Sequence, residues 1–155
     1  MVKLIIVTRE NWKEALNLTV ADEQKGFVPT VAVSLSKVYI KPDGDNVEYI
    51  PFAIYDQHQM VGFVMHAYEE KTTDSYWING FFIDHEFQGK GFGKAALSEM
   101  IQWITERHPR CEVIRLTVDP DNEWAKKLYV SSGFQPTDLK FGEEVVYQLP
   151  VNGGM

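Results

Sequence analysis

The chain has 155 residues with one cysteine, and 45% of them are hydrophobic, so we expect a single domain over residues 1–155 that needs neither disulfide nor metal. Its formal net charge of −7 at pH 7 excludes a general nucleic-acid-binding protein, because phosphate contacts depend on clustered Lys and Arg. The lone cysteine, Cys111, excludes an internal disulfide and favours a reducing compartment.

The first predicted element is a strand, "VKLIIV" at residues 2–7. Its apolar run is too short to span a bilayer, and the N-terminus lacks the successive basic, apolar and small-residue regions of a signal peptide. We therefore expect a soluble, cytoplasmic protein with no membrane partner. "NWKEALNL" at 11–18 then predicts a short helix capped by Asn11, with Glu14 in capping-box spacing.

Residues 21–40 are ambiguous and predict a second short helix and a loop that contains Gly26 and Pro29. Residues 47–69 read as two β-runs joined by a polar turn at 56–59, which predicts an antiparallel hairpin. A further strand is predicted at 76–84, after a polar loop.

The second half of the chain alternates between helical and strand patterns. After Gly93, apolar residues at helical spacing predict an amphipathic helix that ends near 107–109. A strand at 112–118, a helix at 122–133 and a terminal strand at 144–150 follow. The sum is a mixed sheet with helices, in α/β order.

Three alternating glycines, Gly89, Gly91 and Gly93, lie between the strand at 76–84 and the long helix. A strand that enters a glycine-rich turn and then a helix presents free backbone N–H groups and the positive end of the helix dipole, which together attract phosphates. The alternative is a loop that needs glycines only to turn.

The spacing of these glycines excludes two common phosphate sites. A Walker A loop needs GxxxxGK followed by Ser or Thr, but "GKGFGKA" is one residue short and has Ala95 at the hydroxyl position. The dinucleotide fingerprint GxGxxG also fails, because no glycine follows at 94 or 96. Another pyrophosphate is the remaining expectation.

"QGKGFG" at 88–93 matches the QxxGxG/A signature of the GCN5-related N-acetyltransferases, whose loop amides bind the pyrophosphate of acetyl-CoA. The preceding "FFIDHEF" resembles that family's central strand, and "NEWAKKLYVSSGF" at 122–134 resembles its second hallmark. These segments cover about a third of the chain in the right order. One local departure is His85, where many relatives have proline.

The resemblance implies a mixed, mostly antiparallel sheet flanked by helices and splayed at the central strand to hold acetyl-CoA. Phe82 and Ile83 would offer main-chain groups to the pantetheine arm. Asn122 would contact the pantetheine or cap its helix, and Tyr129 would be the general acid or a core aromatic. The residues implied for the pyrophosphate are Gln88, Gly89, Lys90, Gly91, Phe92, Gly93 and Lys94.

Acetyl transfer to an amine sets two proton-transfer requirements. A tyrosine of pKa about 10 can protonate a thiolate of about 8.5 at a cost near 2 kcal/mol. Deprotonation of a primary amine with pKa around 10.4 costs about 4.6 kcal/mol at pH 7, so a base or water chain must remove its proton. Asp84 and Glu48 are possible participants, although both also fit ordinary surface or turn positions, and the base stays unassigned.

Scattered carboxylates could hold the distant ammonium of a polyamine, and the alternative is a solvated acidic rim. They are Asp22, Glu23, Glu48, Glu69, Glu70 and Asp74. "WINGFFIDHEFQGKG" and "FGEEVVYQL" also resemble the bacterial spermine/spermidine acetyltransferases. This resemblance implies a polyamine acceptor. The alternatives are another small amine or a peptide N-terminus, or a non-catalytic acyl-CoA sensor.

Two further expectations concern partners. The resemblance implies acetyl-CoA as cosubstrate. The four histidines have no spacing suited to a metal site, so we expect no metal. A homodimer is a family-level expectation. Trp77, Trp124 and the Phe81–Phe82 pair could line a pocket for an aromatic amine, or belong to the core.

Overall fold

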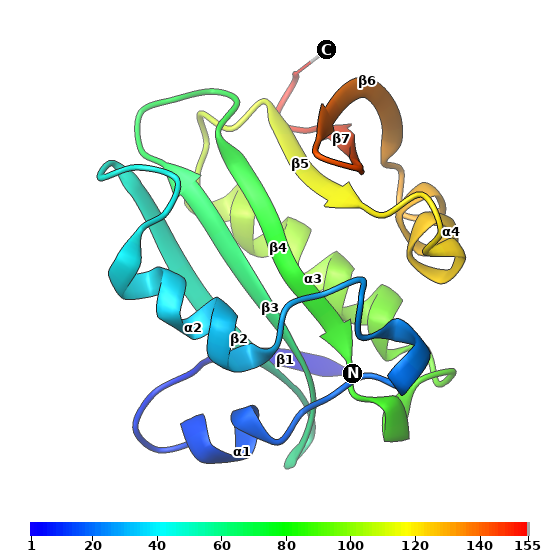
Figure 1. Ribbon diagram of the computed structural model, residues 1–155. Coiled ribbons are helices and arrows are strands. Elements are labelled where there is room, and N and C mark those ends of the chain that lie inside the picture. The colour runs from blue at the N-terminus through cyan, green and yellow to red at the C-terminus, as the bar shows by residue number, and fades with distance from the viewer. Residues whose placement is uncertain (155) are drawn as a thin grey trace.

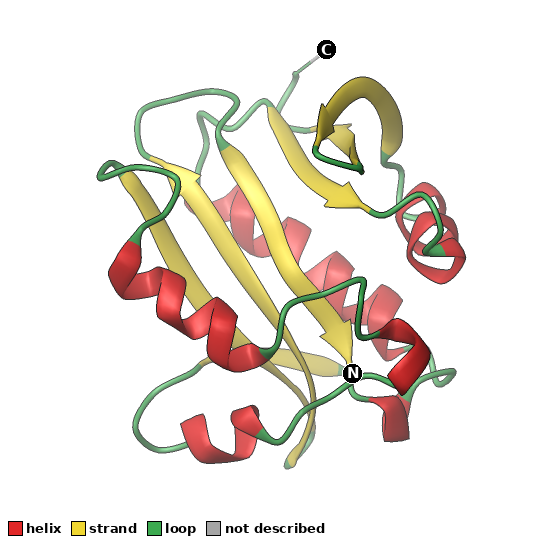
Figure 2. Ribbon diagram, viewed as in Figure 1, coloured by secondary structure: helices red, strands yellow, loops and turns green. Residues whose placement is uncertain are grey.

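The computed structural model describes residues 1–154, which form one twisted seven-stranded sheet with helices on both faces (Figures 1 and 2). The strand order is β1-β2-β3-β4-β5-β7-β6. The elements are β1 (Val2–Ile6), α1 (Trp12–Leu16), η1 (Asp22–Gln24), α2 (Val31–Ile40), β2 (Val47–Asp56), β3 (Gln59–Glu69), β4 (Tyr76–Ile83), η2 (His85–Phe87), α3 (Phe92–Arg107), β5 (Val113–Val118), α4 (Glu123–Ser131), β6 (Gln135–Phe141) and β7 (Glu144–Pro150), where η marks a short 3-10 helix.

The predicted capping box at α1 is wrong. Asn11 stands before the helix, but its side chain makes no capping hydrogen bond. Its Oδ1 instead accepts a hydrogen bond of 2.8 Å from the backbone amide of Thr8. The carboxamide therefore stabilises the turn that precedes the helix and does not cap the first helical amides.

Residues 21–40 contain the expected helix and loop. The short helix η1 is followed by a loop and then by α2, which begins after Thr30. Thr30 caps α2, because its hydroxyl oxygen accepts a hydrogen bond of 3.3 Å from the amide of Val33.

Two hydrophobic cores form because side chains alternate across the sheet. On β2, Phe52 and Ile54 lie in the core that also contains Met100 of α3. The intervening Ala53 lies in the opposite core with Val31 of α2. Helices α1 and α2 thus cover one face of the sheet and α3 covers the other (Figure 1).

The pairing of β4 with β5 is the one parallel contact of the sheet within residues 1–154, and a single residue pair, Trp77 with Arg115, makes it. All other neighbouring strands are antiparallel, so the predicted mixed, mostly antiparallel sheet is confirmed. Beyond Trp77 the two strands diverge, which confirms the expected splay at the central strand.

Strand β6 has no counterpart among the predicted elements. It contains Pro136 and the polar Asp138, and most of its side chains are exposed. Pro and polar residues are tolerated there because β6 is an edge strand whose outer side needs no hydrogen-bond partner. No helix within residues 1–154 combines the length and the hydropathy needed to cross a bilayer.

Candidate active site

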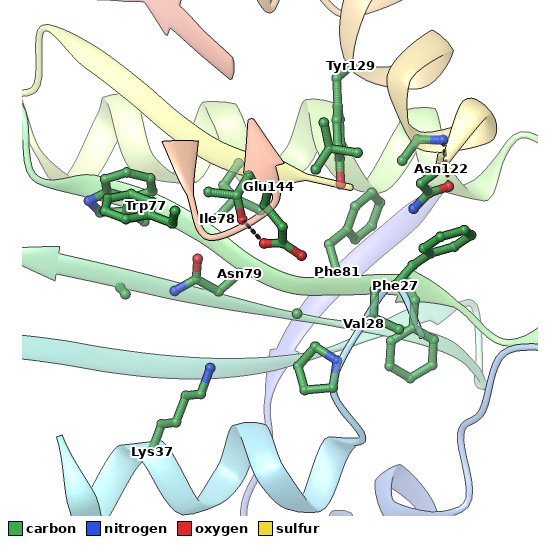
Figure 3. A pocket seen from close by; sticks show the side chains of 18 of the residues that line it. Phe27, Val28, Lys37, Trp77, Ile78, Asn79, Phe81, Asn122, Tyr129 and Glu144 are labelled. Carbon is green, nitrogen blue, oxygen red and sulfur yellow. Dashed lines mark hydrogen bonds between the residues drawn. The ribbon is translucent and has the colours of Figure 1, made fainter. Parts of the chain in front are cut away.

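A cavity of about 560 Å³ occupies the space where β4 and β5 separate (Figure 3). Residues 77–83 of β4 form one wall, and Thr117 and Val118 of β5 form the other. Phe27, Val28 and Pro29, from the loop before α2, close the front of the cavity. Because paired strands expose no free backbone groups on their shared side, the separation makes main-chain groups of both strands accessible here.

A β-bulge shapes the β4 wall. The register of β4 against β3 shifts between Phe63 and Met65, and Gly80 at this point has a φ of +59°. A Cβ on Gly80 would lie 2.8 Å from the Ser34 hydroxyl oxygen of α2. Glycine is therefore required both for the backbone conformation and for the close approach of α2 to the sheet.

The glycine loop follows Gln88, which lines the cavity, and leads into α3. Gly89 and Gly91 have φ values of +79° and +86°, and a Cβ on either would meet no heavy atom within 4 Å. No group within residues 1–154 accepts a hydrogen bond from the amides of residues 89–94. These free donors, at the N-terminus of a 16-residue helix, fit the diphosphate of acetyl-CoA.

Gln88 lines the cavity, but its side chain ties the loop to the rest of the fold. Its Nε2 donates to the Ile83 carbonyl oxygen at 2.9 Å and to Gln24 Oε1 at 3.0 Å. The end of β4 and the start of the loop are thereby held together. Phe82 and Ile83 both line the cavity, as the sequence predicts for residues next to the pantetheine arm.

Two of the other loop residues carry positive charge, and two pack against the rest of the protein. Lys90 and Lys94 are exposed and add positive charge beside the free amides, whereas Phe92 packs partly against the core. Gly93 is buried, and a Cβ there would lie 3.2 Å from the Trp124 ring. Gly93 therefore allows α3 and α4 to lie close together.

Asn122 caps α4 and also lines the cavity. Its Oδ1 accepts a hydrogen bond of 3.3 Å from the amide of Ala125, so it caps α4. It also lines the cavity, where Figure 3 shows it across from Phe27.

Tyr129 projects from α4 into the cavity, and its hydroxyl points toward Phe81 (Figure 3). The residue is only 6% exposed. Burial raises the pKa of Tyr129, and the negative charge of Glu144 raises it further. The hydroxyl is therefore protonated at neutral pH, which is the state that a general acid requires.

Glu144, the first residue of β7, is a cavity residue that the sequence reasoning missed. The Thr117 hydroxyl donates a hydrogen bond of 2.7 Å to Glu144 Oε1. The two residues meet because β5 and β7 are neighbours, and no local pattern in the sequence marks that pairing.

Of the carboxylates expected on the acceptor side, Glu69 lines this cavity, and Asp22, Glu23, Glu48, Glu70 and Asp74 do not. Asp22 and Glu23 lie on the exposed helix η1, where Asp22 forms an ion pair of 2.8 Å with Lys25. Glu48 points away from the core because its neighbours on β2, Val47 and Tyr49, point inward. The acidic residues that line the cavity within residues 1–154 are Asp43, Glu69 and Glu144.

Asp84, considered above as a participant in proton transfer, has a structural role. It is buried, and its carboxylate accepts hydrogen bonds of 3.0 Å from the amides of Thr19 and Glu86. It does not line the cavity.

Aromatic side chains form much of the remaining wall. Trp77, Phe81, Phe82 and Trp124 all line the cavity, and the ring of Trp77 lies 5.6 Å from that of Phe141. Phe81 and Phe82 also belong to the two cores, so the same side chains serve both structure and site. Residues 1–154 contain no group of three or more side chains suited to hold a metal ion.

Comparison with known proteins identifies relatives over nearly the whole chain. Residues 13–134 match the acetyltransferase (GNAT) family. The chain is 32% identical over 146 residues to the spermine/spermidine N(1)-acetyltransferase of Bacillus subtilis (strain 168), covering 90% of this chain and 92% of that protein.

Solved structures show the same fold at low sequence identity. A mutant spermidine N-acetyltransferase from Vibrio cholerae has a TM-score of 0.71 and 20% identity, covering 96% of this chain and 93% of that one. An acetyltransferase from Salmonella typhimurium that modifies the N-terminal serine of ribosomal protein L7/L12 has a TM-score of 0.73 and 14% identity, covering 97% of this chain and 95% of that one. The chain belongs to the GNAT family of acetyltransferases and is an acyltransferase with that family's fold.

Proposed function

We propose that this chain transfers the acetyl group of acetyl-CoA to a primary amine, with a polyamine such as spermine or spermidine as the acceptor. The observation that carries the acetyl transfer is the position of Tyr129. Its protonated hydroxyl lies in the cavity between β4 and β5, at whose end the free amides of the glycine loop begin. Acetyl-CoA, when bound, supplies the thioester that the amine attacks.

Residues of the glycine loop and of β4 would bind this cosubstrate. The amides of residues 89–94 and the charges of Lys90 and Lys94 would hold the diphosphate. Main-chain groups of Phe82 and Ile83, together with Asn122, would orient the pantetheine arm along the opened edge of β4.

Tyr129 would donate its proton to the sulfur of the departing thiolate. A raised pKa makes the phenol a weaker acid, but the same burial disfavours a thiolate formed beside it and raises the pKa of that thiol as well. The difference between the two pKa values, about 1.5 units in water, therefore changes less than either value. A positioned hydroxyl can meet a cost of this size.

The charges of the cavity favour a cationic acceptor. Within residues 1–154 its lining contains three carboxylates, those of Asp43, Glu69 and Glu144, and one cation, Lys37. Asp43 is held in place by the hydroxyl of Tyr49, which donates to its carboxylate. The named function of the Bacillus subtilis relative, which acts on spermine and spermidine, supports the same choice.

The length of the cavity favours a linear acceptor. The amide of Glu69 donates to the carbonyl oxygen of Ser75, so these residues lie level with one another. From Ser75, the residue before β4, to Phe81, beside Tyr129, the chain extends for roughly 20 Å. An extended polyamine can place one amine near Tyr129 and a second ammonium toward Asp43 and Glu69.

Lys37 favours a second candidate. It lines the cavity and forms no ion pair with any residue in 1–154, and Figure 3 shows its amine directed toward Asn79. A free cation repels a polyamine and attracts a carboxylate. An amine that also carries an anionic group, such as a peptide with a free N-terminus and an acidic residue, is the acceptor that this observation supports.

A thiol-release assay with acetyl-CoA tests both candidates. Purified protein is offered spermine, spermidine, amino-sugar antibiotics, arylamines and short peptides, and kcat/KM is compared. We expect the polyamines to give the highest values. Activity confined to peptides would contradict the polyamine proposal, and a failure of acetyl-CoA to bind in calorimetry would contradict acetyl transfer itself.

Two properties outside the cavity stay predictions. A homodimer is tested by light scattering coupled to size-exclusion chromatography, and the cytoplasmic location by fractionation of the source cells. Neither bears on the assignment of the cavity.

A further inference from the structure

We propose that Glu144 contacts the reacting amine and accepts its proton during acetyl transfer. The inference rests on the acetyl transfer proposed above, and it concerns the proton that the amine nitrogen loses as the C–N bond forms, after the ammonium has become neutral. Glu144 is half-buried and follows the turn that joins β6 to β7, opposite Phe141 in the strand register. Figure 3 shows its carboxylate in the cavity, on the same side as the hydroxyl of Tyr129.

The hydrogen bonding of Glu144 leaves one oxygen free. Thr117 donates to Oε1 at 2.7 Å, which fixes the orientation of the carboxylate. Oε2 accepts no hydrogen bond from residues 1–154. A carboxylate with one oxygen anchored and the other facing the cavity is suited to accept a proton from a bound ligand.

Glu144 also lies close enough to Tyr129 for its charge to act on the phenol. Among the charges of the structure, that of Glu144 is the one that raises the pKa of Tyr129, after the larger effect of burial. Tyr129 as the acid and Glu144 as the base therefore lie in the same part of the cavity. This proximity is needed if both act on the same bond rearrangement.

The other carboxylates fit this role less well. Asp84 is occupied by two backbone amides and lies outside the cavity. Glu48 is outside the cavity and forms an ion pair of 2.8 Å with Lys41. Asp43 accepts a hydrogen bond from the hydroxyl of Tyr49. Glu69 pairs with Ser75, which precedes β4, whereas Phe81 lies near the other end of that strand.

The step returns every proton-carrying side chain to its starting state. The ammonium first loses one proton to solvent and binds as a neutral amine. As the new C–N bond forms, the nitrogen becomes cationic and transfers a proton to Glu144 Oε2, while the C–S bond breaks and the sulfur takes the proton of Tyr129. The proton on Glu144 then passes to the Tyr129 phenolate, so both side chains return to their starting states.

The substitution Glu144→Gln tests this role because the amide oxygen can still accept the hydrogen bond from Thr117. Glu143→Gln is the matched control, since Glu143 is the preceding residue, is exposed and lies outside the cavity. We expect Glu144→Gln to lower kcat at least about 100-fold with the best acceptor, while KM for acetyl-CoA and the melting temperature match those of Glu143→Gln. Glu144→Asp should restore part of the lost kcat.

Chemical rescue provides a second readout that a purely structural role would not produce. In Glu144→Ala, added formate can occupy the vacated volume and accept the proton. We expect formate to raise kcat in Glu144→Ala and to leave Glu143→Gln unchanged.

Equal kcat in Glu144→Gln and Glu143→Gln would overturn the assignment, as would a loss confined to KM for the amine. A wild-type protein that acetylates none of the amines would instead overturn the proposed function on which the assignment rests.

Discussion

The imidazole rings of His66 and His108 face each other between β3 and the end of α3, with 3.3 Å between their Nε2 atoms. His66 is fully buried, and its Nδ1 lies 3.0 Å from the carbonyl oxygen of Trp77. A neutral His66 therefore donates from Nδ1 and accepts from His108 at Nε2. The rings of Tyr68 and Tyr76 stack on that of His66.

This pair predicts a loss of stability in mild acid. Burial lowers the pKa of His66 from 6.5 to about 4. Between about pH 6.5 and 4, His66 is therefore protonated in the unfolded chain but neutral in the folded chain. The free energy of unfolding falls as the pH drops through this range. The slope per proton is about 1.4 kcal/mol per pH unit at most. Burial also lowers the pKa of His108, against the raising effect of Glu70.

Urea unfolding at several pH values between 7.5 and 5 measures this effect. We expect His66→Gln to have a smaller pH slope than the wild type, whatever its stability at pH 7.5. His58→Gln is the control, because His58 is exposed in the turn between β2 and β3. Identical slopes in His66→Gln and the wild type would show that another group is responsible.

Replacement of Gly91 by alanine should weaken the binding of coenzyme A. Gly91 has a φ of +86°, so the substitution strains the backbone by about 1 kcal/mol, and its Cβ projects into the open space where the diphosphate would lie. Gly153→Ala is a matched control, with a φ of +83° and equally open surroundings, because Gly153 follows β7 and is not part of the glycine loop. We expect similar losses of stability in both variants, but a roughly tenfold weaker Kd by calorimetry in Gly91→Ala alone. Equal Kd values would remove this loop from cosubstrate binding.

Tyr129→Phe should lower kcat about 100-fold or more and leave KM for acetyl-CoA within about twofold. The hydroxyl of Tyr129 forms no hydrogen bond with residues 1–154, so the melting temperature should change little. Tyr147→Phe is the control, since Tyr147 is equally buried, at 6% exposure, in the same core but outside the cavity. Unchanged turnover in Tyr129→Phe would exclude the general-acid role.

Lys37→Gln should separate the two classes of acceptor. Without a cation in the cavity, kcat/KM for spermine should rise about fivefold, and kcat/KM for a peptide with an acidic residue should fall by a similar factor. Lys25→Gln serves as the control, because Lys25 pairs with Asp22 outside the cavity. A lower kcat/KM for spermine in Lys37→Gln would mean that Lys37 does not face the bound polyamine.

Much of the fold was predictable because its signals are local. The hairpin of β2 and β3 needs only alternating side chains and a polar turn, and α3 needs only apolar residues at helical spacing. Asn11 was predicted wrongly, because two sets of amides can donate to its side-chain oxygen. In the structure this oxygen accepts a hydrogen bond from the amide of Thr8 and not from the first amides of α1.

The cosubstrate side of the cavity could be predicted from the sequence alone, because each of its features is formed by consecutive residues. These features are the glycine loop, the N-terminus of the helix that follows it, and the helix that carries Tyr129. The acceptor side could not. Glu144, Thr117 and Lys37 come from β7, β5 and α2, and they face one cavity because β7 pairs beside β5 and because Gly80 lets α2 approach the sheet. Pairing between distant strands depends on the total burial of the whole sheet, and this is a property that no short window of sequence contains.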